Sequence, residues 1–435
     1  MLSPEENERL TSVVGKTPMG DLIRRYWLPF LASADLPEPD CNPQRVQLLG
    51  EDLVAFRDSS GRVGLVAKSC PHRLADLYYG RNEEDGLRCI YHGWKFDVTG
   101  QCVEAPTEPK AANFAAKMRV RSYPVEEKAG ILFAYLGPSH LTPELPDFEW
   151  MRVPDSHRFI SWSTQDCNYA QAIEGGIDTV HSVYLHSTLD SHRKLDEWKE
   201  NRVSGIVSTT QARLRTRDNP PLLSAENTDY GVIVGGRYAG HEGDGEDYWR
   251  YNLFLLPFYS MPPGAPGQKL CHAFVPLDDT TTARWSITWG LEKPLAARDV
   301  ASMRLGSGVH AQVIPGTHTP VRNRSNDYLQ DRTEQRTFTF TGIRGTGEQD
   351  FAVQEGMGLI VNRSEEHLGV TDIGIIQMRR RLLEQANDLE KGVEPYAAGH
   401  GEVYSVHAGD TMLPIQAADG WAEDERTQKA LAPRW

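Results

Sequence analysis

Two pairs of cysteine and histidine are the side chains in this sequence best suited to binding a metal. Cys70 and His72 stand in "CPHR", and Cys89 and His92 stand in "CIYHGW", with 16 residues between the two pairs. Thiolates and imidazoles bind transition metals, and ligands two or three residues apart on a loop can converge on one point. The spacing therefore predicts a metal centre held between two loops.

Two kinds of centre use this set of ligands. A structural zinc site can take two cysteines and two histidines. In a Rieske [2Fe–2S] cluster, the cysteines bind one iron and the histidines bind the other. The order C-x-H followed by C-x2-H is the Rieske arrangement, which we favour over zinc. The remaining cysteines have no histidine at ligand spacing and are expected to be reduced thiols, at positions 41, 102, 167 and 271.

A second group of metal-binding residue types occurs in "NYAQAIEGGIDTVHSVYLH". The pattern predicts a helix on which Glu174, Asp178 and His181 share one face, because residues three and four apart are neighbours there. His186 would lie about 140° around that helix from His181. The helix must therefore be distorted, or end after His181, if both imidazoles bind one ion.

Two histidines supply two of the three ligands of a facial triad on non-haem Fe(II), whose third ligand is a carboxylate. Candidates for the carboxylate occur in the distant segment "GEQDFAVQEGMG". Asp350 is the first choice and stands at the start of a predicted helix. Glu348 and Glu355 remain alternatives.

The composition excludes several classes of partner. The chain has 435 residues, 39% hydrophobic content and a formal net charge of −14, whereas proteins that bind nucleic acid or anionic membranes favour a basic face. No apolar run approaches the length of a membrane span, and "MLSPEENERL" lacks the apolar core of a signal peptide. We therefore expect a globular, cytoplasmic protein with neither nucleic acid nor membrane as a partner.

The elements that must position these residues change in kind along the chain. Residues 1–26 have helical signals, with Ser3 as a candidate N-cap. From residue 27, alternating apolar runs such as "DLVAFRD" and "RVGLVAK" predict an antiparallel β domain ending near residue 137, with both Cys–His pairs on its loops. The Pro-rich "PSHLTPELPDF" is a candidate junction. Residues 138–435 combine strands with later helices in "DFAVQEGMGLIVNR" and "TDIGIIQMRRRLLEQANDLEKG", so the expected fold class is α+β.

Together these motifs resemble the α (oxygenase) subunit of Rieske non-haem iron ring-hydroxylating oxygenases over nearly the whole chain. "CPHR" and "CIYHGWKFD" are similar to the Rieske loops, and "GEDLVAFRD", "EGGIDTVHS" and "VNRSEEHLGVTD" resemble the phthalate dioxygenase-like class. The resemblance implies a Rieske [2Fe–2S] domain over 27–137 and a helix-grip catalytic domain, an antiparallel sheet with helices, over 138–435. Helices within 1–26 would pack on the catalytic domain.

The resemblance also implies roles for individual residues. The [2Fe–2S] cluster would be bound by Cys70, His72, Cys89 and His92, and the mononuclear Fe(II) by His181, His186 and Asp350. Such enzymes form head-to-tail homotrimers or stacked pairs of trimers. There Asp178 would bridge His92 of a neighbouring subunit to His181 and carry electrons between subunits.

The chain has no G-x-G-x-x-G motif after a strand, so we expect NAD(P)H to act only through a separate reductase. By resemblance, that partner is a flavin and iron–sulfur reductase. The substrates would be O2 and an aromatic, carboxylated small molecule. The reaction would be O-demethylation of a methoxylated aromatic acid or ring cis-dihydroxylation of a phthalate- or phenoxybenzoate-like acid. Cations in 187–260 could bind the carboxylate or form a solvated face, among them Arg193, Lys194, Lys199, Arg202 and Arg237.

Two interpretations from other classes stay open on sequence alone. A Rieske electron-transfer protein without an active mononuclear iron would take up no oxygen. A zinc-stabilised ligand-binding protein with the helix-grip fold would be colourless.

Overall fold

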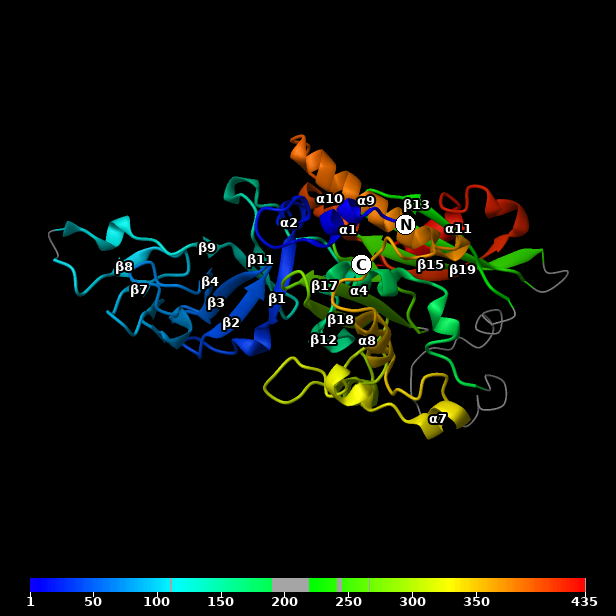
Figure 1. Ribbon diagram of the computed structural model, residues 1–435, viewed down its shortest axis with the longest axis horizontal. Coiled ribbons are helices and arrows are strands. Elements are labelled where there is room, and N and C mark those ends of the chain that lie inside the picture. The colour runs from blue at the N-terminus through cyan, green and yellow to red at the C-terminus, as the bar shows by residue number, and fades with distance from the viewer. Residues whose placement is uncertain (110–111, 190–218, 241–244, 266, 435) are drawn as a thin grey trace. The chain divides into compact units, whose positions relative to one another are not determined.

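The computed structural model describes residues 1–109, 112–189, 219–240, 245–265 and 267–434. The chain forms two compact units, whose elements are labelled in Figure 1. The first unit comprises Met1–Ser12 and Asp147–Trp435, and the second comprises Val13–Pro146. The domain limits expected at residues 26 and 137 stay a prediction.

The second unit is built on three antiparallel sheets, as its alternating apolar runs predict. Their strand orders are β1-β11-β10, β2-β3-β4-β9 and β5-β6-β7-β8. The strands are β1 (Trp27–Ala32), β2 (Gln44–Leu48), β3 (Glu51–Arg57), β4 (Val63–Ala67), β5 (Arg81–Glu83), β6 (Gly86–Arg88), β7 (Lys95–Phe96), β8 (Cys102–Glu104), β9 (Ser122–Tyr123), β10 (Val125–Lys128) and β11 (Ile131–Tyr135). Cys70 and Cys89 belong to the same buried cluster as Phe56, Leu87 and Phe96. The core of this unit therefore anchors both cysteines.

Two short helices lie near the start of the chain. Helix α1 (Pro4–Thr11) begins at the expected Ser3 cap, where the Ser3 hydroxyl accepts from the Glu6 amide at 3.1 Å and the Glu6 carboxylate accepts from the Ser3 amide at 2.8 Å. This capping box satisfies amides that the helix itself cannot pair. Helix α1 belongs to the first unit, whereas α2 (Pro18–Ile23) belongs to the second.

The first unit contains one antiparallel sheet of eight strands. Its order is β12-β18-β17-β16-β15-β14-β13, and β19 pairs with β15. The strands are β12 (Arg158–Gln165), β13 (Leu222–Asn227), β14 (Gly231–Tyr238), β15 (Glu246–Leu255), β16 (Tyr259–Met261), β17 (Gln268–Pro276), β18 (Thr282–Gly290) and β19 (Gly409–Pro414). Nearly every side chain of β15 and β18 is buried, so both faces of the central strands lie inside the unit.

Helices pack against this sheet. Helix α4 (Tyr169–Ile177) packs on β16 and β17, and α9 (Ile373–Glu390) runs alongside β13 and β14 (Figure 1). Helix α8 (Thr346–Gly356) packs against α4. The other α-helices of the described residues are α3 (Glu149–Arg152), α6 (Ala297–Arg304), α7 (Arg332–Thr337), α10 (Tyr396–Gly399) and α11 (Glu425–Leu431). An antiparallel sheet with helices against it confirms the α+β fold class.

Two predicted helices are shorter than expected. Helix α4 ends at Ile177, and α8 ends at Gly356, so "GLIVNR" lies outside it. Gly358 has a φ of +97°, a conformation that glycine adopts without penalty and that does not continue a helix. Helix α9 covers most of its predicted segment and is followed by Gly392 with a φ of +86°, as expected.

Candidate metal centres

Helix α4 ends because its sequence ceases to favour helix. Gly175 and Gly176 weaken the last turn. Asp178 has an extended backbone, with φ of −64° and ψ of 121°, and its Oδ1 accepts from the Val180 amide at 2.7 Å. Such a local side-chain contact competes with a continued helix. The prediction that Glu174, Asp178 and His181 share one helical face is therefore wrong, because the helix stops before His181 rather than after it.

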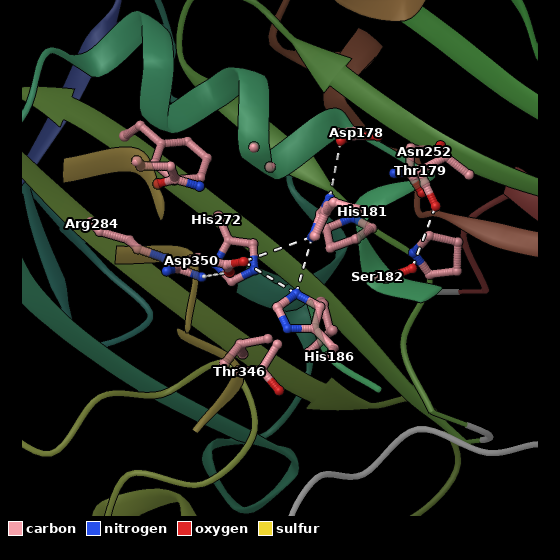
Figure 2. Close-up of a pocket in the computed structure, with 18 of the residues that line it drawn as sticks. Asp178, Thr179, His181, Ser182, His186, Asn252, His272, Arg284, Thr346 and Asp350 are labelled. Carbon is pink, nitrogen blue, oxygen red and sulfur yellow. Dashed lines mark hydrogen bonds and ion pairs between the residues drawn. The ribbon is translucent and has the colours of Figure 1, made fainter. Parts of the chain in front are cut away.

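The chain beyond Asp178 folds back and brings two imidazoles together. A short 3-10 turn begins at His181, and the Nε2 atoms of His181 and His186 lie 3.0 Å apart. Asp350, from the first half of α8, places Oδ1 3.1 Å from His186 Nε2 and 3.7 Å from His181 Nε2. Figure 2 shows the three side chains pointing toward one another. Within the described ranges, they form the one group of three or more His, Cys, Asp or Glu side chains whose ligand atoms all lie within 4.8 Å of one another, as the ligands of a single ion do.

Each imidazole has a hydrogen-bond acceptor behind it. His186 Nδ1 lies 2.7 Å from Gln349 Oε1, and His181 Nδ1 lies 3.4 Å from Asp178 Oδ2. An amide oxygen and a carboxylate can only accept, so both Nδ1 atoms carry the proton. Both Nε2 atoms therefore present lone pairs toward each other and toward Asp350.

Lone pairs that face one another at these distances repel, and a metal ion bound between them would remove that repulsion. Bonds of about 2.1 Å at right angles around a metal place neighbouring donor atoms about 3.0 Å apart. The separations of 3.0 and 3.1 Å match this value, and the third, of 3.7 Å, is somewhat longer. Two imidazoles and one carboxylate are also the donor set of non-haem Fe(II), which keeps its other positions open. The three residues fit such an iron.

The two carboxylates at this site are ionised at neutral pH. Burial by itself would raise the pKa of Asp350, but His186, Arg284 and His181 outweigh burial and hold that pKa far below its usual range. Burial would also raise the pKa of Asp178, but its contacts with His181 and with backbone amides lower it. Both side chains are therefore fixed negative charges beside the imidazoles.

The other carboxylates considered from the sequence lie outside this group. Glu174 is buried against two arginines of the same unit. Glu348 is fully buried, lies 3.6 Å from Arg322, and has its pKa raised to about 7 by burial. The Glu355 carboxylate accepts from a tyrosine hydroxyl and a backbone amide. Of the candidates, Asp350 is the one that faces the two histidines.

A pocket opens at the three-residue group. Its polar lining includes Arg250, Asn252, His272 and Arg284 (Figure 2 labels the last three). Burial and the nearby Arg284 hold the pKa of His272 well below its usual range, so this imidazole is neutral. The apolar lining consists of Pro262, Pro263, Leu270, Phe274 and Val309.

Of the cations singled out from the sequence, Arg237 lies among the described residues. It lies outside the lining of the pocket and pairs with Asp247 at 3.3 Å. The other four lie outside the described residues, at positions 193, 194, 199 and 202.

Close packing fixes the end of α4 against the sheet. A Cβ atom on Gly176 would lie 2.8 Å from the Phe274 ring and 2.7 Å from Ser260 Oγ, closer than real Cβ contacts. Asn252 Nδ2, from β15, donates to the Ile177 carbonyl at 3.1 Å. Glycine at 176 therefore lets the helix end lie directly on the strands, which determines where His181 begins its turn.

The two Cys–His pairs lie on loops of the second unit. Cys70 and Cys89 are 1% and 3% exposed, and the rings of His72 and His92 lie 4.4 Å apart. Each loop turns back on itself, because the Cys70 carbonyl accepts from the Leu74 amide at 2.8 Å and the Cys89 carbonyl accepts from the Gly93 amide at 3.0 Å. Both histidines therefore lie next to each other, as the spacing predicts.

The donor set of these loops fits a [2Fe–2S] cluster. His92 Nδ1 is buried and has no hydrogen-bond partner among the described residues. Burial raises the pKa of the Cys70 thiol to about 11, and the adjacent Cys89 sulfur adds to that rise. Iron would bind the two neighbouring buried sulfurs as thiolates. It would also give the buried ring nitrogen the partner that it lacks.

Two side chains at the mononuclear site were not predicted from the sequence. Gln349 accepts from His186, and Arg284 pairs with Asp350. Arg284 stands in "TARWSITWG", a strand whose residues are all buried. Burying a charge in such a strand is unfavourable unless the charge is paired. The arginine in this apolar segment could therefore have indicated a buried acidic partner.

Comparisons with known proteins find a match for each of the two parts of the chain. The sequence matches the Rieske [2Fe-2S] domain family over residues 26–124 and the family described as "LigXa C-terminal domain like" over residues 134–426. It is 37% identical to the phthalate 4,5-dioxygenase oxygenase subunit of Pseudomonas putida, over 92% of this chain and 90% of that protein. It is 32% identical to the 5,5'-dehydrodivanillate O-demethylase oxygenase subunit of Sphingobium sp. (strain NBRC 103272 / SYK-6), over 91% and 83% respectively.

A solved structure shares the fold. The structure of a mutant of NdmA from Pseudomonas putida CBB5 with caffeine matches with a TM-score of 0.59, over 88% of this chain and 96% of that chain, at 17% identity. The chain therefore belongs to the Rieske non-haem iron oxygenases. Within this family it is an oxygenase (α) subunit, an enzyme whose cofactors are a [2Fe–2S] cluster and a mononuclear iron.

The electron-carrier and zinc-protein interpretations find no support among these relatives.

No helix in the described ranges is long and apolar enough to cross a membrane.

Proposed function

We propose that this oxygenase acts on an aromatic substrate that carries a carboxylate, and that Arg250 binds the carboxylate. The observation that supports this is the composition of the pocket, in which an arginine and apolar side chains lie beside the group of His181, His186 and Asp350. Arg250 is 8% exposed, and one of its guanidinium nitrogens donates to the Pro263 carbonyl at 3.0 Å. A guanidinium presents donors in a planar fork that matches a carboxylate.

The names of similar proteins support an acidic substrate. They include a phthalate 4,5-dioxygenase, a 3-chlorobenzoate-3,4-dioxygenase, a phenoxybenzoate dioxygenase and the O-demethylase. We propose that this chain performs one of two reactions: O-demethylation of a methoxylated aromatic acid, or ring cis-dihydroxylation of a phthalate- or phenoxybenzoate-like acid. Formaldehyde would identify the first reaction and a diol the second.

We assign the mononuclear iron to His181, His186 and Asp350. When bound, the iron supplies activation of O2 at the coordination positions that three protein ligands leave open. Asp178 and Gln349 hold the imidazoles with Nδ1 protonated, so that Nε2 faces the metal. The apolar side chains of the pocket contact the substrate ring and exclude water.

We assign the [2Fe–2S] cluster to Cys70, His72, Cys89 and His92. We further propose a homotrimer, or a stacked pair of trimers, in which Asp178 bridges His92 of one subunit to His181 of the next. An ionised carboxylate has acceptor capacity for both imidazoles, and Asp178 already lies beside one of them. A separate flavin and iron–sulfur reductase would pass electrons from NAD(P)H to the cluster, in the cytoplasm.

The first test is the metal content of anaerobically purified protein. We expect about three irons and two sulfides per chain and a red-brown colour. Oxygen uptake with a panel of aromatic acids would then identify the substrate through formaldehyde or diol formation. Zinc without sulfide would contradict the assignment of both centres.

The substrate proposal is tested by Arg250→Met. We expect KM for the acid substrate to rise about 10- to 100-fold, because the substitution removes the hydrogen bonds between the guanidinium and the charged carboxylate. The methyl ester of the same acid, which has no carboxylate, serves as the matched comparison and should be affected little by the substitution. Equal effects on acid and ester would contradict a role in carboxylate binding.

A further inference from the structure

Arg284 pairs with Asp350, the candidate metal-binding carboxylate. It lies on β18, is 3% exposed, and its Nη2 is 3.2 Å from Asp350 Oδ2. Its Nη1 donates to the Gly347 carbonyl at 3.2 Å, and its guanidinium lies 4.9 Å from the centre of the Phe351 ring. The strand therefore holds a cation against the first turns of α8, the helix that carries Asp350. Figure 2 shows Arg284 beside Asp350.

The two oxygens of Asp350 have different partners. Oδ1 faces the imidazoles, 3.1 Å from His186 Nε2 and 3.7 Å from His181 Nε2. Oδ2 faces Arg284. A carboxylate can bind a metal through one oxygen or through two, and an oxygen held by a guanidinium is withdrawn from the metal.

The placement of Arg284 does not serve stability alone. Its Nε is buried and has no hydrogen-bond partner among the described residues. A buried ion pair often contributes less to stability than apolar side chains of the same volume, and an unsatisfied donor adds a cost. A buried arginine that faces Asp350 under these conditions points to a function at the site it contacts.

We propose that Arg284 is a positioning residue that makes Asp350 a one-oxygen ligand and thereby keeps one more coordination position open on the metal. Its guanidinium holds Oδ2, so only Oδ1 would reach a bound ion. The guanidinium is always protonated, so it also offsets the charge of the carboxylate at any working pH. The inference rests on the assignment of His181, His186 and Asp350 as metal ligands.

The test compares Arg284→Met and Arg284→Lys in the full-length protein, with the mononuclear site loaded with Co(II) or Fe(II). X-ray absorption and near-infrared magnetic circular dichroism report the number of ligands. We expect Arg284→Met to gain one oxygen ligand while retaining its metal, because Oδ2 is released toward the ion. Arg284→Lys keeps a cation and a donor, so it should stay closer to the wild-type coordination.

Steady-state kinetics provide the second readout. We expect kcat of Arg284→Met to fall about 10- to 100-fold, a typical effect of residues that orient a metal ligand, with KM little changed. Arg298→Met removes an exposed arginine of the same unit and should match the wild type in metal content, coordination and kcat.

Three results would contradict the inference. Unchanged coordination in Arg284→Met would show that Oδ2 is not being withheld from the metal. A raised KM with unchanged kcat would make Arg284 a substrate contact instead. Failure of the wild type itself to bind Co(II) or Fe(II) at His181, His186 and Asp350 would overturn the proposed function, and this inference with it.

Discussion

The two imidazoles that face Asp350 differ in the group behind each of them. His181 has the carboxylate of Asp178 behind its Nδ1, whereas His186 has the neutral amide of Gln349. A carboxylate makes an imidazole ligand more basic than a neutral acceptor does. We infer that His181 is the more electron-rich ligand, and that Gln349 serves His186 mainly by fixing its tautomer and orientation.

Gln349→Leu tests this role. Gln349 Nε2 donates to the Thr341 hydroxyl and the Ile343 carbonyl at 3.1 and 2.8 Å, which fixes its amide oxygen toward His186. Leucine removes the acceptor, so the affinity for Fe(II) should fall about 10- to 100-fold in an anaerobic titration. Gln349→Glu keeps an acceptor and should retain most of the affinity. If both variants bound Fe(II) like the wild type, the tautomer argument would fail.

Single residues were predictable where their partners are close in sequence. The spacing of His181 and His186, and that of the two Cys–His pairs, predicted the clusters that the structure contains, because each pair lies within a few residues of one turn. The partner of His186 is 163 residues away, and the partner of Arg284 is 66 residues away. No local pattern reports such contacts, because they arise from strand order and helix packing.

At the scale of elements, the end of α4 determines the site, and a buried charge network holds that helix. Glu174 Oε1 accepts from Arg363 Nε at 2.9 Å and from Arg379 Nε at 2.7 Å. Arg379, on α9, also donates to both oxygens of Glu366, at 2.6 and 2.8 Å. Glu174 therefore ties the helix that precedes His181 to α9, a role that its spacing to Asp178 did not reveal.

Glu174→Gln should destabilise the protein, because it leaves two buried arginines with one carboxylate fewer. We expect a loss of about 3–5 kcal/mol in the free energy of unfolding at pH 7, measured by urea denaturation. Glu246→Gln removes a carboxylate from an exposed ion pair with Arg426 and is expected to cost under about 1 kcal/mol. Equal effects of the two substitutions would contradict the network's importance.

The effect of Glu174→Gln should also depend on pH. Burial would raise the pKa of Glu174, but Arg363 and Arg379 lower it below its ordinary value of 4.5. A lowered pKa in the folded state stabilises the fold above the ordinary value, and this contribution is lost as the pH falls through the folded-state value. The difference between wild type and variant should therefore be largest at neutral pH and shrink below about pH 4.5.

The helices themselves were predicted better than their ends. Apolar periodicity gave the position of α9, and alternation gave the strands of the second unit. The end of α4 depends on the contact of Asp178 with the Val180 amide and on the room that Gly176 leaves at the sheet. Both depend on three-dimensional placement, so the sequence indicated that the helix must break without indicating where.

At the scale of the whole molecule, the two candidate metal centres belong to different compact units. In the proposed head-to-tail ring, electrons pass from the cluster of one subunit to the iron of the next. His92→Ala disables the cluster and His186→Ala disables the iron, so each variant alone should be inactive. Co-refolded or co-expressed in equal amounts, they should recover about one quarter of the wild-type activity, because one interface in four joins an intact cluster to an intact iron.

The matched control is the double variant His92→Ala/His186→Ala mixed with wild type. In an equal mixture of these two proteins, only the wild-type chains carry an intact cluster and an intact iron. Electron transfer within one chain would therefore give half of the wild-type activity. Absence of any recovery in the first mixture, with trimers demonstrated by light scattering, would contradict transfer between subunits.

The close approach at Gly176 limits how the substrate range of this enzyme can change. A methyl group there would displace the Phe274 ring or the helix end, and with it the turn that starts at His181. Leu270 and Val309 line the same pocket without holding a metal-binding side chain. A library of variants directed at these two positions should yield altered selectivity with iron retained, whereas any side chain at position 176 should yield inactive protein. Adaptation to new compounds is therefore expected to proceed through the pocket wall, with the glycine left unchanged.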